Sequence, residues 1–151
     1  MVSLTAGIAA FAANTFLDTS VNVIAPPLQL TVDNNNIDFG DAQAGLRSSS
    51  ITVIATVISQ ASNYNVSISG EDFIGVNTND TIPISSVQYS ATTDDEMRTG
   101  DVSTSSTIVF ENQPATSSSG KNYTFLLGLV VPDSTTPDQY EGAIILEAST
   151  I

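Results

Sequence analysis

The chain has 151 residues, 41% of them hydrophobic, which is enough for one domain with a core of its own. Because it contains neither cysteine nor histidine, disulfides, the common zinc sites and the Ser-His and Cys-His catalytic pairs are excluded. Sixteen acidic residues against three basic ones give a net charge of -13, which argues against a nucleic-acid partner and against binding to anionic lipid. The other polar residues are mostly Ser, Thr and Asn, which suit a secreted or cell-surface protein.

The first segment, MVSLTAGIAAFAANTF (1–16), carries no charge. A secretory leader begins with basic residues, but Arg47 is the first basic residue of this chain. A transmembrane helix needs about 20 apolar residues, whereas this run contains several polar residues and ends before Asp18. We therefore expect no membrane span in this chain.

The same segment alternates apolar residues with small or polar ones from Val2 to Ala10, which is the periodicity of a β-strand. Pro26 and Pro27 then end the segment, because proline interrupts a strand. We accordingly divide the chain into an N-terminal strand arm (1–25) and a β-sandwich domain (26–151).

The arm has three interpretations: a leader remnant, the first strand of its own sandwich, or a donor strand that completes the sheet of a neighbouring subunit. We favour the donor strand, because a strand added to an open sheet gains main-chain hydrogen bonds and fills apolar pockets with alternate side chains. Such a contact runs head to tail and builds a filament. The residues expected to bind the neighbouring subunit are Val2, Leu4, Ala6, Ile8, Ala10 and Phe11.

Period-two alternation also dominates the rest of the chain, and turn-forming residues separate the alternating segments. This pattern predicts an all-β fold, a single immunoglobulin-like or jelly-roll β-sandwich. We expect a loop over TTDDEMRTGD (92–101). The expected strands are residues 27–32, 50–59, 63–70, 82–90, 106–112, 122–131 and 139–148.

Two segments resemble immunoglobulin-like surface domains. In residues 28–73, an IDFG strand (37–40) and a glycine turn lead into a long alternating strand. Residues 131–148 resemble the closing hairpin of such domains, in which a proline-containing loop and a Tyr-x-Gly step open the last strand. The resemblance implies a β-sandwich fold but does not indicate a particular function.

The layout of the chain also resembles the TasA/camelysin-like fibre proteins and the archaeal bundling-pilus and thread subunits. The similarity lies in the apolar N-terminus, the NTFL step, the LQLTV strand and the Ser/Thr/Asn-rich sandwich, and is strongest over ANTFLDTSVNVIAPPLQLTV (13–32). It implies an extracellular, helical homopolymer of identical subunits joined by donor-strand complementation. The peptidase activity described for camelysin-like proteins is not carried over, because this chain has no histidine.

Two further kinds of site are expected on the sandwich. Three N-x-S/T sequons make N-linked glycans possible partners, at Asn65, Asn79 and Asn122. Acidic residues could bind calcium, which prefers carboxylate oxygens, although a solvated acidic loop is the simpler interpretation. The calcium candidates are Asp94, Asp95, Glu96 and Asp101, with Asp33, Asp38 and Asp41 as a second, weaker group.

We expect the chain to be a structural subunit of an extracellular filament and not an enzyme, with no cofactor unless calcium binds. Paired carboxylates for glycosidase chemistry are available among sixteen acids, but the chain has no tryptophan and only 7% aromatic residues to form a sugar platform. The alternatives are a monomeric immunoglobulin-like adhesion or S-layer-associated domain, and a calcium-dependent tubule subunit.

Overall fold

The computed structural model describes residues 28–151, so the predicted arm (1–25) lies outside the described residues. Within the described range the chain forms nine strands and one short 3-10 helix. They are β1 (Gln29–Val32), β2 (Ile51–Ile58), β3 (Tyr64–Gly75), β4 (Thr81–Ile82), η1 (Ile84–Ser86), β5 (Val87–Thr92), β6 (Met97–Asp101), β7 (Thr107–Gln113), β8 (Lys121–Leu129) and β9 (Tyr140–Thr150).

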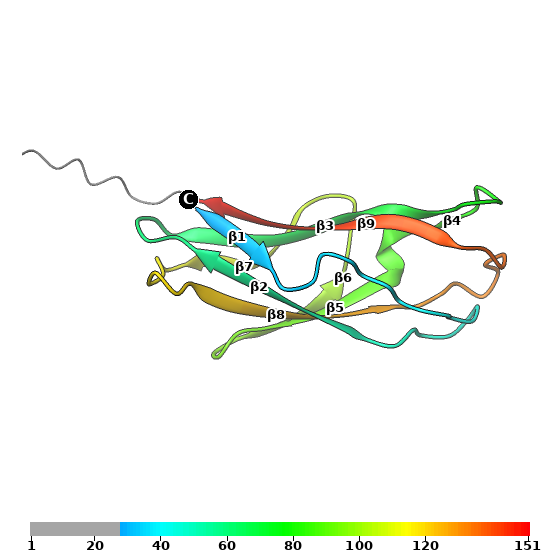
Figure 1. The fold of residues 1–151 in the computed structure, drawn as a ribbon, viewed down its shortest axis with the longest axis horizontal. Helices are drawn as coiled ribbons and strands as arrows, with labels where there is room; N and C mark the ends of the chain where they lie inside the picture. Colours follow the sequence, from blue (N-terminus) through cyan, green and yellow to red (C-terminus); the bar gives the residue numbers. More distant parts are fainter. Residues whose placement is uncertain (1–27) are drawn as a thin grey trace, which may run out of the picture.

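These strands build two antiparallel sheets that lie face to face, as Figure 1 shows. The five-stranded sheet has the order β1-β2-β8-β5-β6. In the four-stranded sheet, β3 pairs with β9 along one edge and with β7 and β4 along the other. The predicted all-β sandwich is therefore confirmed.

The alternation in the sequence sets which side chains form the core. Along β2, Val53, Ala55 and Val57 are buried, while the residues between them reach the outer face. Strand β8 buries Tyr123, Phe125, Leu127 and Leu129 in the same way. Each large aliphatic side chain buried in this manner stabilises the fold by about 1.5–3 kcal/mol.

A small polar cluster lies inside this apolar core. The hydroxyls of Tyr64 and Tyr123 are 2.8 Å apart, and Tyr123 also donates to Oε1 of Gln113 at 3.3 Å. Lys121 Nζ donates to the same oxygen at 2.9 Å. Burial raises the pKa of both tyrosines, so these hydroxyls stay protonated and act as donors that tie β3, β7 and β8 together.

Two strand predictions are corrected by the structure. Residues 82–90 do not form one strand: Pro83 has no N–H to donate, and the chain passes through η1 before β5 begins at Val87. Residues 92–101, predicted as a loop, contain β6, which pairs with β5 from Gln88–Asp101 to Thr92–Met97.

The two immunoglobulin-like segments also differ from expectation. Residues 37–40 form no strand, although Ile37 and Phe39 still pack against the core. Residues 131–148 form no hairpin, because β8 belongs to the five-stranded sheet and β9 pairs with β3 in the other. The loop at 130–139 therefore crosses from one sheet to the other.

Across residues 28–151, the structure contains no helix that is long and apolar enough to cross a membrane.

Candidate functional site

Strand β9 presents an open sheet edge. Its eleven residues pair with β3, from Thr150–Tyr64 to Tyr140–Gly75. Within residues 28–151, no strand pairs with the opposite edge of β9. An edge of this length leaves a row of backbone N–H and C=O groups available to another strand.

Beside this edge lies a mainly apolar groove of about 370 Å³. Its floor includes Val53 and Leu127 of the five-stranded sheet, and β1 and β9 form its two sides. Val53 and Leu127 are themselves buried, 3% and 1% exposed, so the accessible apolar surface of the groove comes from side chains on its two sides, among them Val32 and Ile145. Its lining residues are Leu30, Val32, Asn34, Asn35, Ile37, Val53, Leu127, Ile144, Ile145 and Leu146.

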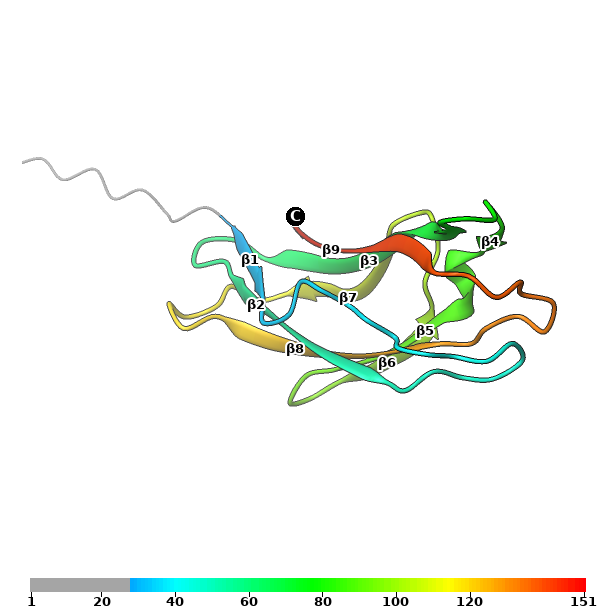
Figure 2. The same cartoon turned by 45° about the vertical axis from the view of Figure 1, so that its right-hand side comes forward.

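Figure 2 shows the segment between β1 and β2 passing along the side of the sandwich, between the two sheets. Its residues Asn34, Asn35 and Ile37 line the groove. At its start, two hydrogen bonds join Asp33 to the backbone of Ile54. The Asp33 N–H donates to the Ile54 carbonyl oxygen at 3.0 Å, and the Ile54 N–H donates to Asp33 Oδ1 at 2.7 Å. At its end, Gly45 N donates to the carbonyl of Val131 at 2.9 Å. Between these anchors the chain contacts the core through Ile37 and Phe39 and adds no strand to either sheet.

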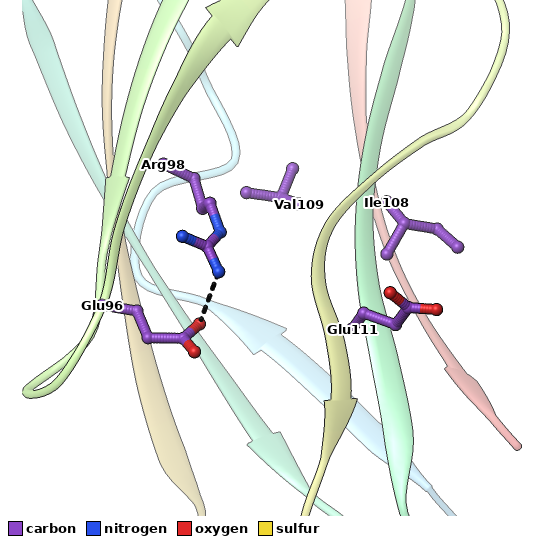
Figure 3. A pocket seen from close by; sticks show the side chains of 5 residues that line it. All are labelled: Glu96, Arg98, Ile108, Val109 and Glu111. Carbon is purple, nitrogen blue, oxygen red and sulfur yellow. Dashed lines mark ion pairs between the residues drawn. The ribbon is translucent and has the colours of Figure 1, made fainter.

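The opposite side of the sandwich has a different chemistry. A pocket of about 440 Å³ lies between β6 and β7 (Figure 3), where Glu96 and Arg98 form an ion pair at 3.6 Å. Glu111 of β7 also lines this pocket. Charged side chains at sheet edges oppose strand addition. Strand β9 also carries two, Glu141 and Glu147, but neither lines the apolar groove.

The three sequons lie in different environments. Asn79 is exposed in the turn after β3 and has a left-handed φ of 58°. Asn65 is half-buried on β3, and its Oδ1 accepts a bond from the Asn112 N–H at 2.8 Å. Asn122 is exposed on β8, where its Oδ1 accepts from Thr56 Oγ1 at 2.8 Å. Asn79 is therefore the most accessible of the three acceptors.

The structure does not bring the predicted calcium ligands together. Asp94 and Asp95 lie in the β5–β6 turn, Glu96 pairs with Arg98, and Asp101 ends β6. Among the residues that the structure describes, no group of three or more acidic side chains is placed to hold a metal ion.

The second acidic group is likewise spread along its segment. Asp33 and Asp38 both accept bonds from backbone N–H groups, Asp38 from Gly40 at 2.8 Å. These two carboxylates stabilise local turns and strand starts.

The sequence did not reveal the apolar groove. Its alternation predicted a strand over residues 139–148, but not that this strand would border a groove. The six predicted donor-strand residues, Val2, Leu4, Ala6, Ile8, Ala10 and Phe11, lie outside the described residues.

No family model matches the chain, and no curated protein matches it. A solved structure of a family 123 glycoside hydrolase from Clostridium perfringens, studied for glycolipid glycan hydrolysis, matches with a TM-score of 0.48 and 16% sequence identity. The match covers 82% of this chain and 25% of that chain, so this chain spans about a quarter of that enzyme's length.

This match contradicts the prediction that the chain is not an enzyme, and we withdraw that prediction. The absence of histidine and the scarcity of aromatic residues exclude particular catalytic groups but not every enzyme class. The likeness itself is too low to bring a residue role, a substrate or an activity to this chain.

Proposed function

We propose that this chain is the repeating subunit of an extracellular filament, in which residues 2–11 of one copy add a strand to β9 of the next copy. The observation that carries this proposal is the apolar groove beside the unpaired edge of β9. The groove offers the unpaired backbone groups of β9 and an apolar lining, which are the two things that an added strand binds.

The arm and the groove match in chemistry. The first sixteen residues carry no charge in a chain whose net charge is -13, and the groove is lined mainly by aliphatic side chains. An apolar strand entering this groove brings no carboxylate into a partly buried site, where an unpaired charge is costly. Alternate residues of the arm (Val2, Leu4, Ala6 and Ile8) would face the floor.

The two partners also match in length. A strand rises about 3.3 Å per residue, so residues 2–11 extend over roughly 30 Å and the eleven residues of β9 over a similar distance. Full pairing along β9 is therefore possible without a gap. Because the donor and the acceptor are different surfaces, each added subunit leaves a new groove open, and the contact propagates as a filament.

Negative-stain microscopy of the purified full-length chain tests this function. We expect filaments from the wild-type chain and none from Val32→Glu, which places a carboxylate in the groove. Ile74→Glu is the matched control, because Ile74 is 44% exposed against 39% for Val32 and does not line the groove. This control should polymerise normally.

Discrete monomers of the wild-type chain at high concentration would contradict the proposal and favour a monomeric adhesion or S-layer-associated domain. Filaments that form equally well from Val32→Glu would place the subunit contact elsewhere.

A further inference from the structure

The only lysine of the chain lies on the inner face of its strand. Lys121 begins β8 on the same face as Tyr123 and Phe125, both of which are buried. The sequence contains sixteen acidic residues, yet within residues 28–151 Lys121 forms no ion pair. Its Nζ instead donates to a neutral amide, at 2.9 Å from Oε1 of Gln113. The structure thus pairs a lysine amine with a carboxamide and not with a carboxylate.

A β-bulge in β7 turns the Gln113 amide toward this lysine. The register of β7 against β3 shifts beside Tyr64, which lies opposite Gln113. Within the bulge, Asn112 has a left-handed φ of 49°, and hydrogen bonds of 2.9 and 2.8 Å join it to the side chains of Asn63 and Asn65. Bulges redirect side chains, and such backbone conformations are kept where the surrounding structure holds them. As a result, Gln113 is only 6% exposed.

Two buried tyrosines act on the same amide. The Tyr123 hydroxyl donates to Gln113 Oε1 at 3.3 Å, and the Tyr64 hydroxyl lies 2.8 Å from that of Tyr123. Neither tyrosine is exposed to solvent. A donor aimed at a carbonyl oxygen stabilises the negative charge that this oxygen gains when a nucleophile attacks its carbon. The cluster therefore holds a nucleophile, an electrophilic carbonyl and a donor for the developing oxyanion.

We propose that Lys121 and Gln113 form an intramolecular isopeptide bond. Lys121 is half-buried, so its ammonium can release one proton to water before the amine attacks. Nζ then bonds to Cδ of Gln113, while Tyr123 stabilises the charge on Oε1. One proton passes from Nζ to Nε2, the Cδ–Nε2 bond breaks, and Nε2 leaves as ammonia. Ammonia takes up the released proton, so one lysine ammonium and one amide give a secondary amide and one ammonium ion.

The fold supplies the proximity that this reaction needs. Strand β7 belongs to the four-stranded sheet and β8 to the five-stranded sheet, so the two side chains meet only when the sandwich closes. Groups held in this way react as if at concentrations of about 10⁵ M or more. The bond would join the two sheets covalently in a chain that has no cysteine for a disulfide. It forms within one subunit, so it does not depend on the filament proposed above.

Trypsin digestion and mass spectrometry of the full-length chain test this proposal. Trypsin cleaves after lysine and arginine, and the chain offers it three sites, after Arg47, Arg98 and Lys121. A lysine whose amine is in an isopeptide bond is not cleaved. The chain is first folded and incubated, then denatured and digested. We expect residues 99–151 to remain one peptide, lighter than its sequence mass by one molecule of ammonia, whereas an unreacted chain gives 99–121 and 122–151.

Three variants and one condition serve as controls. Lys121→Arg keeps the positive charge but lacks the amine, so it should keep its full mass and be cleaved at residue 121. Tyr123→Phe should slow the appearance of the uncleaved peptide roughly tenfold or more. Tyr140→Phe should react as wild type does, because the Tyr140 hydroxyl donates to the Thr136 carbonyl outside the cluster. Wild type kept in urea throughout should not react.

The wild-type measurement decides the proposal without requiring any variant to fold. Complete cleavage after Lys121 in the folded wild-type chain, with no loss of ammonia after prolonged incubation, would overturn it and leave a hydrogen bond only. A loss of ammonia that persists in Lys121→Arg would place the reaction at another amide and would also overturn it. An uncleaved, lighter peptide from a chain that forms no filaments would reject the proposed function and support the isopeptide bond.

Discussion

At the residue scale, Asp138 holds two loops together at one end of the sandwich. Its carboxylate accepts four bonds of 2.7–2.8 Å from the backbone and side chains of Asn77 and Thr78. The bond from the Asn77 side chain, with those from Thr78 and the Asn77 N–H, lowers the pKa of Asp138 well below its usual range. The loop that leads into β9 is therefore fixed to the turn that follows β3.

This lowered pKa makes a prediction about stability and pH. A carboxyl group whose pKa is lower in the folded state stabilises the fold above its unfolded pKa of about 3.9 and loses that contribution as the pH falls below it. Asp138→Asn should thus lower the melting temperature at pH 7. The difference in melting temperature between this variant and wild type should become smaller below about pH 4. Thermal unfolding monitored by circular dichroism measures both effects.

Asp94→Asn is the control for this prediction, because Asp94 is exposed in the β5–β6 turn; it should melt as wild type does at pH 7. If the difference in melting temperature between Asp138→Asn and wild type stayed constant from pH 7 to pH 2, the ionised Asp138 carboxylate would not be the stabilising group.

At the element scale, the close approach of β3 and β9 depends on Gly70. A Cβ at this position would lie 2.6 Å from the carbonyl oxygen of Ala143 on β9 and 2.7 Å from Cδ1 of Ile84. The first of these neighbours is backbone and cannot rotate away. Any side chain at Gly70 must therefore push β9 from β3 and disturb the edge that borders the groove.

Gly70→Ala should destabilise the fold by about 1–3 kcal/mol, the usual cost of overpacking, and should speed hydrogen exchange at the amides of β9. Urea unfolding and amide exchange measure these two effects. Ser69→Ala, one residue earlier and half-exposed, should remain within about 0.5 kcal/mol of wild type. A Gly70→Ala variant as stable as the Ser69 control would show that the two strands can separate freely.

The elements that sequence alone predicts are those with one buried face. Residues 51–58 and 121–129 bury alternate side chains over most of their length because one face of each strand lies against the core. Strand β6 was not predicted from the sequence. Most of its residues are exposed on both faces, so its sequence shows no alternation of apolar and polar residues. The apolar groove could not be predicted because it depends on which sheet β9 joins, and the periodicity of a strand does not specify its partner.

At the scale of the whole molecule, the sandwich has two different lateral sides and two different outer faces. Within residues 28–151, one side has the apolar groove and the unpaired edge of β9, while the other carries the Glu96–Arg98 ion pair. One outer face lacks acids on four of its five strands, while the other carries them.

The most direct test of strand addition is cysteine cross-linking. Because the chain contains no native cysteine, only the introduced cysteines can form disulfides. An Ile8→Cys chain is mixed with a Leu146→Cys chain, or with Ile144→Cys to cover the register, under mild oxidation. We predict a disulfide-linked dimer from each productive mixture, much less from Ala9→Cys on the other face of the arm, and a ladder of multimers from the Ile8→Cys/Leu146→Cys double variant. A double variant that cross-links only within one chain, or mixtures that form no disulfide, would contradict addition of the arm to a neighbouring subunit.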